Sequence, residues 1–216
     1  MRLTKYTHAC VRLEHDGRAI VIDPGVWSEP EALDGVTDVL VTHEHFDHID
    51  FDRLTALHKA NPDLSVYAPA AVAAHEKAAD LREAFVEVAI GDETVVNGFA
   101  VRPVGGIHAE IYEGLPGCAN AGFLVGHDAL DGALYHPGDS LFLPDLPVAT
   151  LLVPTSAPWL KLSEALDFVR AVGPRRAYSI HDAMLSPVGQ QSVDGWIGFK
   201  GSTEYARIDI GDSVSL

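Results

Sequence analysis

Runs of alternating or continuous apolar residues dominate the first part of the chain. They predict β-strands at residues 3–6, 9–14, 18–23 and 37–42. The polar residues 15–18 separate the second and third of these strands and predict a tight hairpin turn. Phe51, Leu54 and Leu57 recur at every third position, which predicts a helix over residues 51–60 that ends at Asn61 and Pro62. The chain therefore opens with a β-meander followed by a helix.

The rest of the chain continues the same mixture of strands and helices. Further helices are predicted at residues 69–81 and 163–172, the second ended by Gly173 and Pro174. Further strands are predicted at residues 64–68, 85–89, 93–97, 99–104, 119–126, 132–136, 149–154 and 175–180, with a turn from Asp128 to Asp131. Because no linker, charge run or close repeat separates the halves, we predict a single α/β domain over residues 1–216, with two similar halves packed face to face.

Composition and charge narrow the choice of partners. The 216 residues are 47% hydrophobic, which is enough for a substantial core, and 31 acidic against 15 basic residues give a formal charge of −16. This charge repels polyanions, so we expect a small-molecule substrate and no nucleic acid. The first residues lack the apolar run of a signal peptide and no stretch reaches membrane-spanning length, so we expect a cytoplasmic protein that binds no membrane. Cys10 and Cys118 are expected to be free thiols, and the oligomeric state is left open.

The stretch VTHEHFDHID, residues 41–50, holds three histidines and three acidic residues directly after an apolar strand. Crowding such hydrated groups costs desolvation and repulsion unless something binds them, and a metal ion would remove that cost. On an extended segment His43 and His45 point the same way and can bind one ion, whereas Asp47 and His48 face another. A solvated polar turn is the alternative interpretation.

Three later residues strengthen the metal hypothesis, because each follows a predicted strand: His108, Asp139 and His181. Taken singly, each would be interpreted as a capping or hydrogen-bonding residue. Taken with the first cluster, they supply enough donors for two ions, with Asp139 able to bridge them. The predicted ligands are His43, His45 and His108 for one ion, and Asp47, His48, Asp139 and His181 for the other.

The motifs LVTHEHFDHID, GGIHAEI, YHPGDS and YSIHD follow one another as in the metallo-β-lactamase superfamily, which the chain resembles over nearly its whole length. The early IDP, with Asp23, resembles the first motif of that family. The resemblance implies a four-layer αβ/βα sandwich, in which two sheets pack together, helices cover the outside and the metals lie at one edge of the sheets. It also implies that Asp23 hydrogen-bonds the metal loop and is not itself a ligand.

Within the superfamily, TKYTHACVRLEHDGRAIVIDP is similar to metal-dependent hydrolases grouped with ascorbate-6-phosphate lactonase and N-acylphosphatidylethanolamine phospholipase D. The chain departs from that branch twice: Thr7 stands where a glycine is usual, and Asp182 where Tyr or Phe is frequent. The resemblance makes His8 a candidate to support the ligands or face the substrate. His136, directly before the bridging-Asp motif, is a candidate to line the cleft.

The ligand set predicts hydrolysis. Two divalent ions roughly 3.5–4 Å apart share a water and lower its pKa toward about 7, so the expected nucleophile is a metal-bridging hydroxide. Asp47 is expected to orient this water or hold its proton, and Asp139 to set the separation of the ions, so these two are the predicted catalytic residues. Zinc is the default metal for a histidine-rich site, and Mn or Fe also suits it.

We therefore predict a dinuclear metal-dependent hydrolase that cleaves a small ester-like substrate, namely a lactone, a carboxylic ester or a phosphoester. Candidate substrate contacts are Trp27, Tyr112, Trp159 and Lys161. One alternative is a nuclease of the same fold, which the acidic charge disfavours. A flavodiiron oxidoreductase would carry a carboxylate in place of His45, and the remaining alternative is a metal-binding module without catalysis.

Overall fold

Two mixed β-sheets of seven strands each face one another in the computed structural model, which describes residues 1–115, 117–127 and 129–216. In spatial order the first sheet contains β14 (Ser213–Ser215), β1 (Arg2–Lys5), β2 (Val11–His15), β3 (Arg18–Ile22), β4 (Asp38–Leu40), β5 (Ser65–Ala68) and β6 (Phe85–Glu87). The second contains β13 (Glu204–Ala206), β12 (Arg176–Ile180), β11 (Val148–Pro154), β10 (Ala133–His136), β9 (Ala119–Gly126), β8 (Phe99–Ile107) and β7 (Thr94–Val96).

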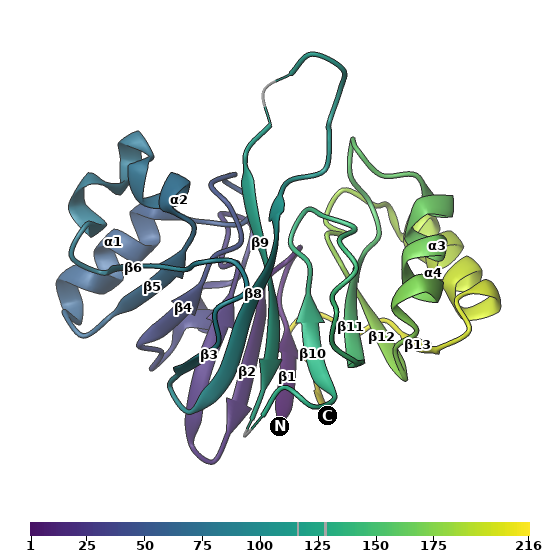
Figure 1. Cartoon of the computed structure of the whole chain (residues 1–216), viewed down its shortest axis with the longest axis horizontal. Coiled ribbons are helices and arrows are strands. Elements are labelled where there is room, and N and C mark those ends of the chain that lie inside the picture. The colour runs from purple at the N-terminus through teal and green to yellow at the C-terminus, as the bar shows by residue number, and fades with distance from the viewer. Residues whose placement is uncertain (116, 128) are drawn as a thin grey trace.

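Helices cover the outer faces of both sheets, which gives four layers (Figure 1). On the first sheet lie α1 (Phe51–Ala60), α2 (Ala70–Ala74) and the short 3₁₀ helices η1 (Pro30–Leu33) and η2 (Glu76–Leu81). On the second lie α3 (Leu162–Val172) and α4 (Pro187–Lys200). The predicted αβ/βα sandwich is therefore confirmed. No helix in the described parts of the chain is long and apolar enough to span a membrane.

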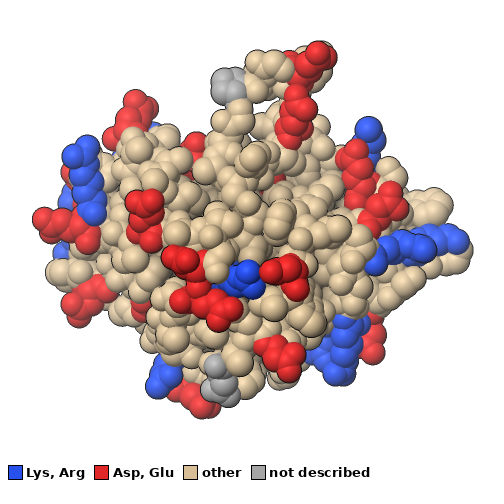
Figure 2. Space-filling view, viewed as in Figure 1, with Lys and Arg blue, Asp and Glu red and all other residues tan. Residues whose placement is uncertain are grey.

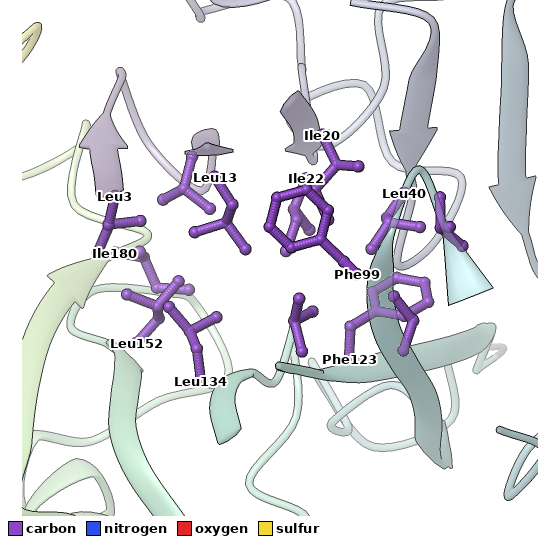
Figure 3. Packing of buried hydrophobic residues seen from close by; sticks show 14 of the residues in the cluster. Leu3, Leu13, Ile20, Ile22, Leu40, Phe99, Phe123, Leu134, Leu152 and Ile180 are labelled. Carbon is purple, nitrogen blue, oxygen red and sulfur yellow. The ribbon is translucent and has the colours of Figure 1, made fainter. Parts of the chain in front are cut away.

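Three hydrophobic clusters hold the four layers together. The cluster between the sheets joins residues such as Leu13 and Ile22 to Phe123 and Leu152, which point toward one another in Figure 3. Neighbouring residues on the same strands turn the other way: Val21 packs under the helices of the first sheet, and Leu151 under those of the second. Each central strand is thus buried on both faces, which explains its nearly continuous apolar sequence.

Several local signals in the sequence are confirmed. The turn between β2 and β3 places Asp16 and Gly17 at φ values of 48° and 75°, the backbone that a two-residue hairpin requires. Helix α1 spans the predicted residues, and its N-cap Asp50 accepts a hydrogen bond from the backbone N–H of Arg53. Helix α3 ends at Gly173 in the left-handed conformation, as expected. The predicted turn from Asp128 to Asp131 begins at a residue that lies outside the described ones.

Other elements differ from the sequence prediction. The helix predicted over 69–81 is wrong, because the backbone is extended at His75 and divides it into α2 and η2. The His75 ring stacks on Phe51 of α1 at 4.7 Å between ring centroids, and its Nδ1 accepts a hydrogen bond from the backbone N–H of Lys77 at the start of η2. Helix α4 was not predicted, because its sequence contains three glycines and only a weak apolar stripe. It is stabilised by burying Val193 and Ile197 against the second sheet.

Candidate metal centre

The residues predicted as ligands all follow strands that end at one edge of the sandwich. His43, His45, Asp47 and His48 lie in the loop after β4, and His108, Asp139 and His181 follow β8, β10 and β12. His8 joins them from the loop after β1. The connection between β8 and β9 projects beyond the sheets at this edge, which is the upper edge in Figure 1.

The structure sorts these side chains into two groups, in each of which the potential ligand atoms lie within 4.8 Å of one another. The first group contains His43, His45, His108 and Asp139; the second contains His8, Asp47, His48 and His181. Asp139 contacts both groups: its Oδ2 is 3.2 Å from Nε2 of His108, and its Oδ1 is 3.0 Å from Nε2 of His181. All seven predicted ligands are therefore brought together, with Asp139 between the groups.

These close contacts are not ordinary hydrogen bonds. Nε2 of His48, His108 and His181 and Oδ1 of Asp139 are buried but have no hydrogen-bond partner, although His48 Nε2 lies 3.1 Å from that oxygen. Buried polar atoms without partners are costly and rare, so their convergence needs an explanation. Imidazole nitrogens and a carboxylate aimed at a common point are the donor set that a divalent ion requires. The residues fit a metal centre.

Hydrogen bonds behind the rings leave the inward nitrogens free for a metal. Nδ1 of His108 donates to the carbonyl of Ala109 at 2.5 Å, and Nδ1 of His181 donates to the carbonyl of Ser156 at 2.6 Å. Because a carbonyl can only accept, Nδ1 carries the proton in both rings and Nε2 keeps its lone pair when the ring is neutral. The ring orientations are thus fixed by the protein before any ion binds.

Asp23 and Thr42 hold the other two buried rings. Asp23 accepts hydrogen bonds from the Thr42 hydroxyl at 2.8 Å and from Nδ1 of His48 at 2.6 Å. Since the Thr42 hydroxyl proton is used in this way, its oxygen accepts from Nδ1 of His43, 2.9 Å away. Asp23 is fully buried and supports the metal loop from behind, the position that the sequence indicates for it.

His8 contacts Asp47. The backbone N–H of Ala183 donates to His8 Nδ1 at 3.4 Å, so Nε2 carries the proton and donates to Asp47 Oδ2 at 3.2 Å. Burial lowers the pKa of His8 to about 4. Burial also raises the pKa of Asp47, but the hydrogen bond from His8 and the charge of His48 outweigh this and lower it to about 2. Asp47 is therefore held as a carboxylate.

Asp139 is the most strongly perturbed acid of the centre. Burial alone would raise its pKa, but the charge of His48 and the contacts with His108 and His181 hold the pKa well below its ordinary value. Its backbone N–H donates to Asn120 at 3.0 Å, and the indole N–H of Trp159 donates to Oδ2 at 3.0 Å. These two bonds orient the carboxylate between the two groups.

Three other predicted residues make no hydrogen bond or ion pair with the candidate ligands in the described part of the chain. His136 is fully buried and does not line a cleft, because its Nε2 donates to the carbonyl of Ala9 and its Nδ1 accepts from the N–H of Gly138. The Lys161 side chain is 80% exposed and pairs with Glu164 in the first turn of α3. Tyr112 is 73% exposed on the projecting β8–β9 connection, and both Lys161 and Tyr112 stay predictions as substrate contacts.

Trp159 and Trp27 lie beside the centre. The Trp159 ring is 6.1 Å from that of His108, and the Trp27 ring meets His8 edge to face at 4.9 Å. Thr42 and Asn120 also support the centre, and Sγ of Cys118 lies 3.9 Å from Nε2 of His45; none of the three is predicted from the sequence. Burial raises the pKa of Cys118 to about 11, so the thiol is neutral. Only the position of Thr42 within the histidine motif could have indicated a supporting role.

Comparison with known proteins agrees with this geometry. A family model described as the beta-lactamase superfamily domain matches residues 2–181, which include every strand end that contributes to the centre. The chain belongs to the metallo-β-lactamase superfamily. Protein Rv0786c of Mycobacterium tuberculosis is 41% identical to it over 188 residues, which are 87% of this chain and 86% of that protein.

More distant members of the superfamily match along almost the whole length. The UPF0173 metal-dependent hydrolase MK1542 of Methanopyrus kandleri is 27% identical to this chain over 227 residues. The match covers 97% of this chain and 94% of that protein. Among solved structures, Igni18, described as a novel metallo hydrolase from Ignicoccus hospitalis, superposes with a TM-score of 0.74 at 20% identity, covering 99% of this chain and 97% of that one. The last similarity is evidence for the shared metallo-β-lactamase fold.

Proposed function

We propose that this metallo-β-lactamase-fold protein is a hydrolase that holds two divalent metal ions, preferentially zinc, and cleaves a small ester-like substrate. The observation that carries the proposal is the convergence of buried, unpartnered ring nitrogens around the Asp139 carboxylate. The names of relatives such as MK1542 point the same way. The narrower likeness to ascorbate-6-phosphate lactonase stays a prediction.

The two groups of side chains would each hold one ion. His43, His45 and His108 would bind the first, and Asp47, His48 and His181 the second, with Asp139 shared between them. Two ions so held would polarise the scissile bond and supply a nucleophile from water at neutral pH. The Zn preference follows from the number of imidazole nitrogens, and Mn or Fe would fit the same carboxylates.

The protein's own groups would then orient the reactants. Asp47 is partly exposed, ionised and positioned by His8, so its carboxylate can accept a hydrogen bond from an attacking water and orient it. His8 donates to Asp47 and is therefore a positioning residue in this arrangement. Trp159 holds the Asp139 carboxylate in place from the opposite side.

The net charge of −16 supports a small substrate over a nucleic acid. Figure 2 shows acidic side chains scattered over the visible face and on the projecting connection, with basic ones mostly near the edges. A long polyanion would meet repulsion before it reached the metal centre. A small neutral ester, lactone or phosphoester would not be repelled in this way.

Metal analysis together with a substrate panel tests the proposal. The protein would be stripped with a chelator, reconstituted with zinc and assayed with p-nitrophenyl acetate, a lactone, bis-p-nitrophenyl phosphate, structured RNA and single-stranded DNA. We expect two ions per chain and metal-dependent turnover of a small substrate. One ion or none after full reconstitution would contradict the dinuclear centre, and a far higher kcat/KM for nucleic acid would overturn the substrate class.

The variant Asp139→Ala should lose most of the bound metal and all measurable turnover, because Asp139 is the side chain in contact with both groups. Asp145→Ala is the matched control, since Asp145 is 71% exposed and pairs only with Arg102 among the ion pairs of the described residues. Elemental analysis of both variants separates the roles. Equal metal content in the two variants would show that Asp139 is not a ligand.

A further inference from the structure

A pocket of about 260 Å³ lies beside the metal centre and is formed largely by residues of the β8–β9 connection. The candidate ligands His45 and His108 are among its lining residues, together with Cys118. Its described lining residues also include Ile107, Ala109, Glu110, Ile111, Leu115 and Gly117. The pocket is smaller than the roughly 300 Å³ at which ligand sites usually begin, so it fits one substituent of a substrate better than a whole substrate.

The walls of this pocket expose apolar side chains that are normally buried. Ile107 is 76% exposed, Leu115 56% and Ile111 39%, although all three are aliphatic. Exposed apolar residues gathered in one place mark a binding surface more often than isolated ones do. Glu110 is the one acidic side chain in the described lining, which contains no lysine or arginine that could pair with a carboxylate or phosphate.

A second hollow also adjoins His45, and its walls carry more charge. It measures about 400 Å³, and its described lining contains the acidic residues Glu44, Asp50, Asp52 and Glu76, a single lysine, Lys77, and the apolar residues Val26, Phe46, Ile49 and Phe51. Burying an apolar group beside these carboxylates would also desolvate them. Because its described lining contains one carboxylate, Glu110, the hollow at the β8–β9 connection is the better suited of the two to an apolar substituent.

We infer that this pocket receives an uncharged alkyl or acyl chain of the substrate, so that the enzyme prefers medium-chain esters or lactones to short ones. The inference rests on the proposed function, because it takes the bond that is cleaved to lie at the metal centre. Because the candidate ligands His45 and His108 line the pocket, a chain bound in it would lie next to that bond. Ile107, Ile111 and Leu115 would then determine chain-length specificity.

A homologous series of p-nitrophenyl esters from acetate to octanoate tests the inference. Full burial of a methylene is worth about 0.8 kcal/mol, or roughly fourfold, and an open pocket buries about half of that, so we expect kcat/KM to rise about twofold per methylene from acetate to hexanoate. The rise should stop when the chain reaches the end of the pocket. Equal kcat/KM values along the series would overturn the inference while leaving hydrolysis itself established.

Substitutions in the pocket wall test which residues contact the alkyl chain of the substrate. Ile111→Ser and Leu115→Ser should each lower the hexanoate-to-acetate ratio of kcat/KM several-fold, whereas Val188→Ser should not change it. Val188 is a suitable control because it is 76% exposed on α4 and does not line the pocket. An unchanged hexanoate-to-acetate ratio in both variants would overturn the inference. If that ratio is unchanged but the sedimentation coefficient changes, the inference is also overturned, and the apolar residues form an interface between copies of the chain.

A binding measurement on the metal-free protein keeps the test independent of turnover. Cys118 lines the pocket and Cys10 is fully buried, so alkylation by N-ethylmaleimide reports on the pocket through Cys118, located by mass spectrometry. Hexan-1-ol should slow this alkylation several-fold at concentrations where ethanol has no effect. If no ester is cleaved yet hexan-1-ol protects Cys118, the proposed function fails and the apolar pocket stands; no protection would refute the pocket.

Discussion

Gly138→Ala should destabilise the protein through a specific steric overlap beside the metal centre. Gly138 has φ of 60°, and a Cβ at this position would lie 2.7 Å from Cβ of Thr42 and would also collide with the side-chain oxygen of Asn120. Both neighbours are fixed: Thr42 is bonded to Asp23, and Asn120 accepts from the backbone N–H of Asp139. The overlap therefore has to be relieved by moving the metal loop or the Asp139 turn.

The matched control is Gly17→Ala in the turn between β2 and β3. Gly17 has φ of 75°, and its Cβ would meet nothing within 4 Å. Each substitution incurs the cost of a left-handed alanine, about 1–2 kcal/mol. Overpacking adds about 1–3 kcal/mol, and only Gly138→Ala incurs it. We therefore expect Gly138→Ala to lose about 1–3 kcal/mol more of its unfolding free energy than Gly17→Ala.

Urea unfolding followed by circular dichroism would measure both variants without metal, with equal m-values confirming that the unfolded states are comparable. Elemental analysis would follow the metal content of each. We expect Gly138→Ala, and not Gly17→Ala, to bind less metal, because Asp139 directly follows the displaced residue. Equal destabilisation and equal metal content would refute the packing argument at the Asp139 turn.

Two further substitutions probe the support of the centre. Asp182→Asn removes the carboxylate that contacts both Lys5 and Arg207 and leaves these cations partly buried. We therefore expect the free energy of unfolding in urea to fall by about 3 kcal/mol. A fall below about 1 kcal/mol would show that these ion pairs are dispensable. Trp159→Phe removes the hydrogen bond to Asp139, and kcat/KM should fall about tenfold, or about 1.4 kcal/mol, with metal content retained. Unchanged kinetics would rule out a role for the indole N–H.

The sequence predicted the fold well where local signals and burial agree. Helices α1 and α3 carry capping residues or a terminal glycine together with an apolar stripe, so their bounds were correct within one residue. Helix α4 has an N-cap, Ser186, but its glycines conceal the helical pattern, and only its packing on the second sheet makes it a helix. At the break, the His75 side chain caps η2 and also stacks on Phe51 of α1, and the second contact is one that no local pattern contains.

The candidate centre was predictable to the extent that its residues form short motifs at strand ends. The proximity of Asp139 to both ligand groups follows from strand order, which the motif order indicates. One error concerns direction: His136 is one residue from the turn but points into the protein, where its Nε2 donates to the carbonyl of Ala9. Which way a side chain points depends on backbone hydrogen bonds that form across the fold.

Each of the two ligand groups takes members from both sheets. In the first, His43 and His45 come from the loop after β4, and His108 and Asp139 from loops after β8 and β10. The distance between ligands is therefore set by how far apart the sheets pack, and that distance depends on side chains such as Phe123 in the cluster between them. During evolution, a change of volume in this cluster would alter metal affinity without touching a ligand. The thickness of the inner core thus constrains the spacing of the two ligand groups from a distance.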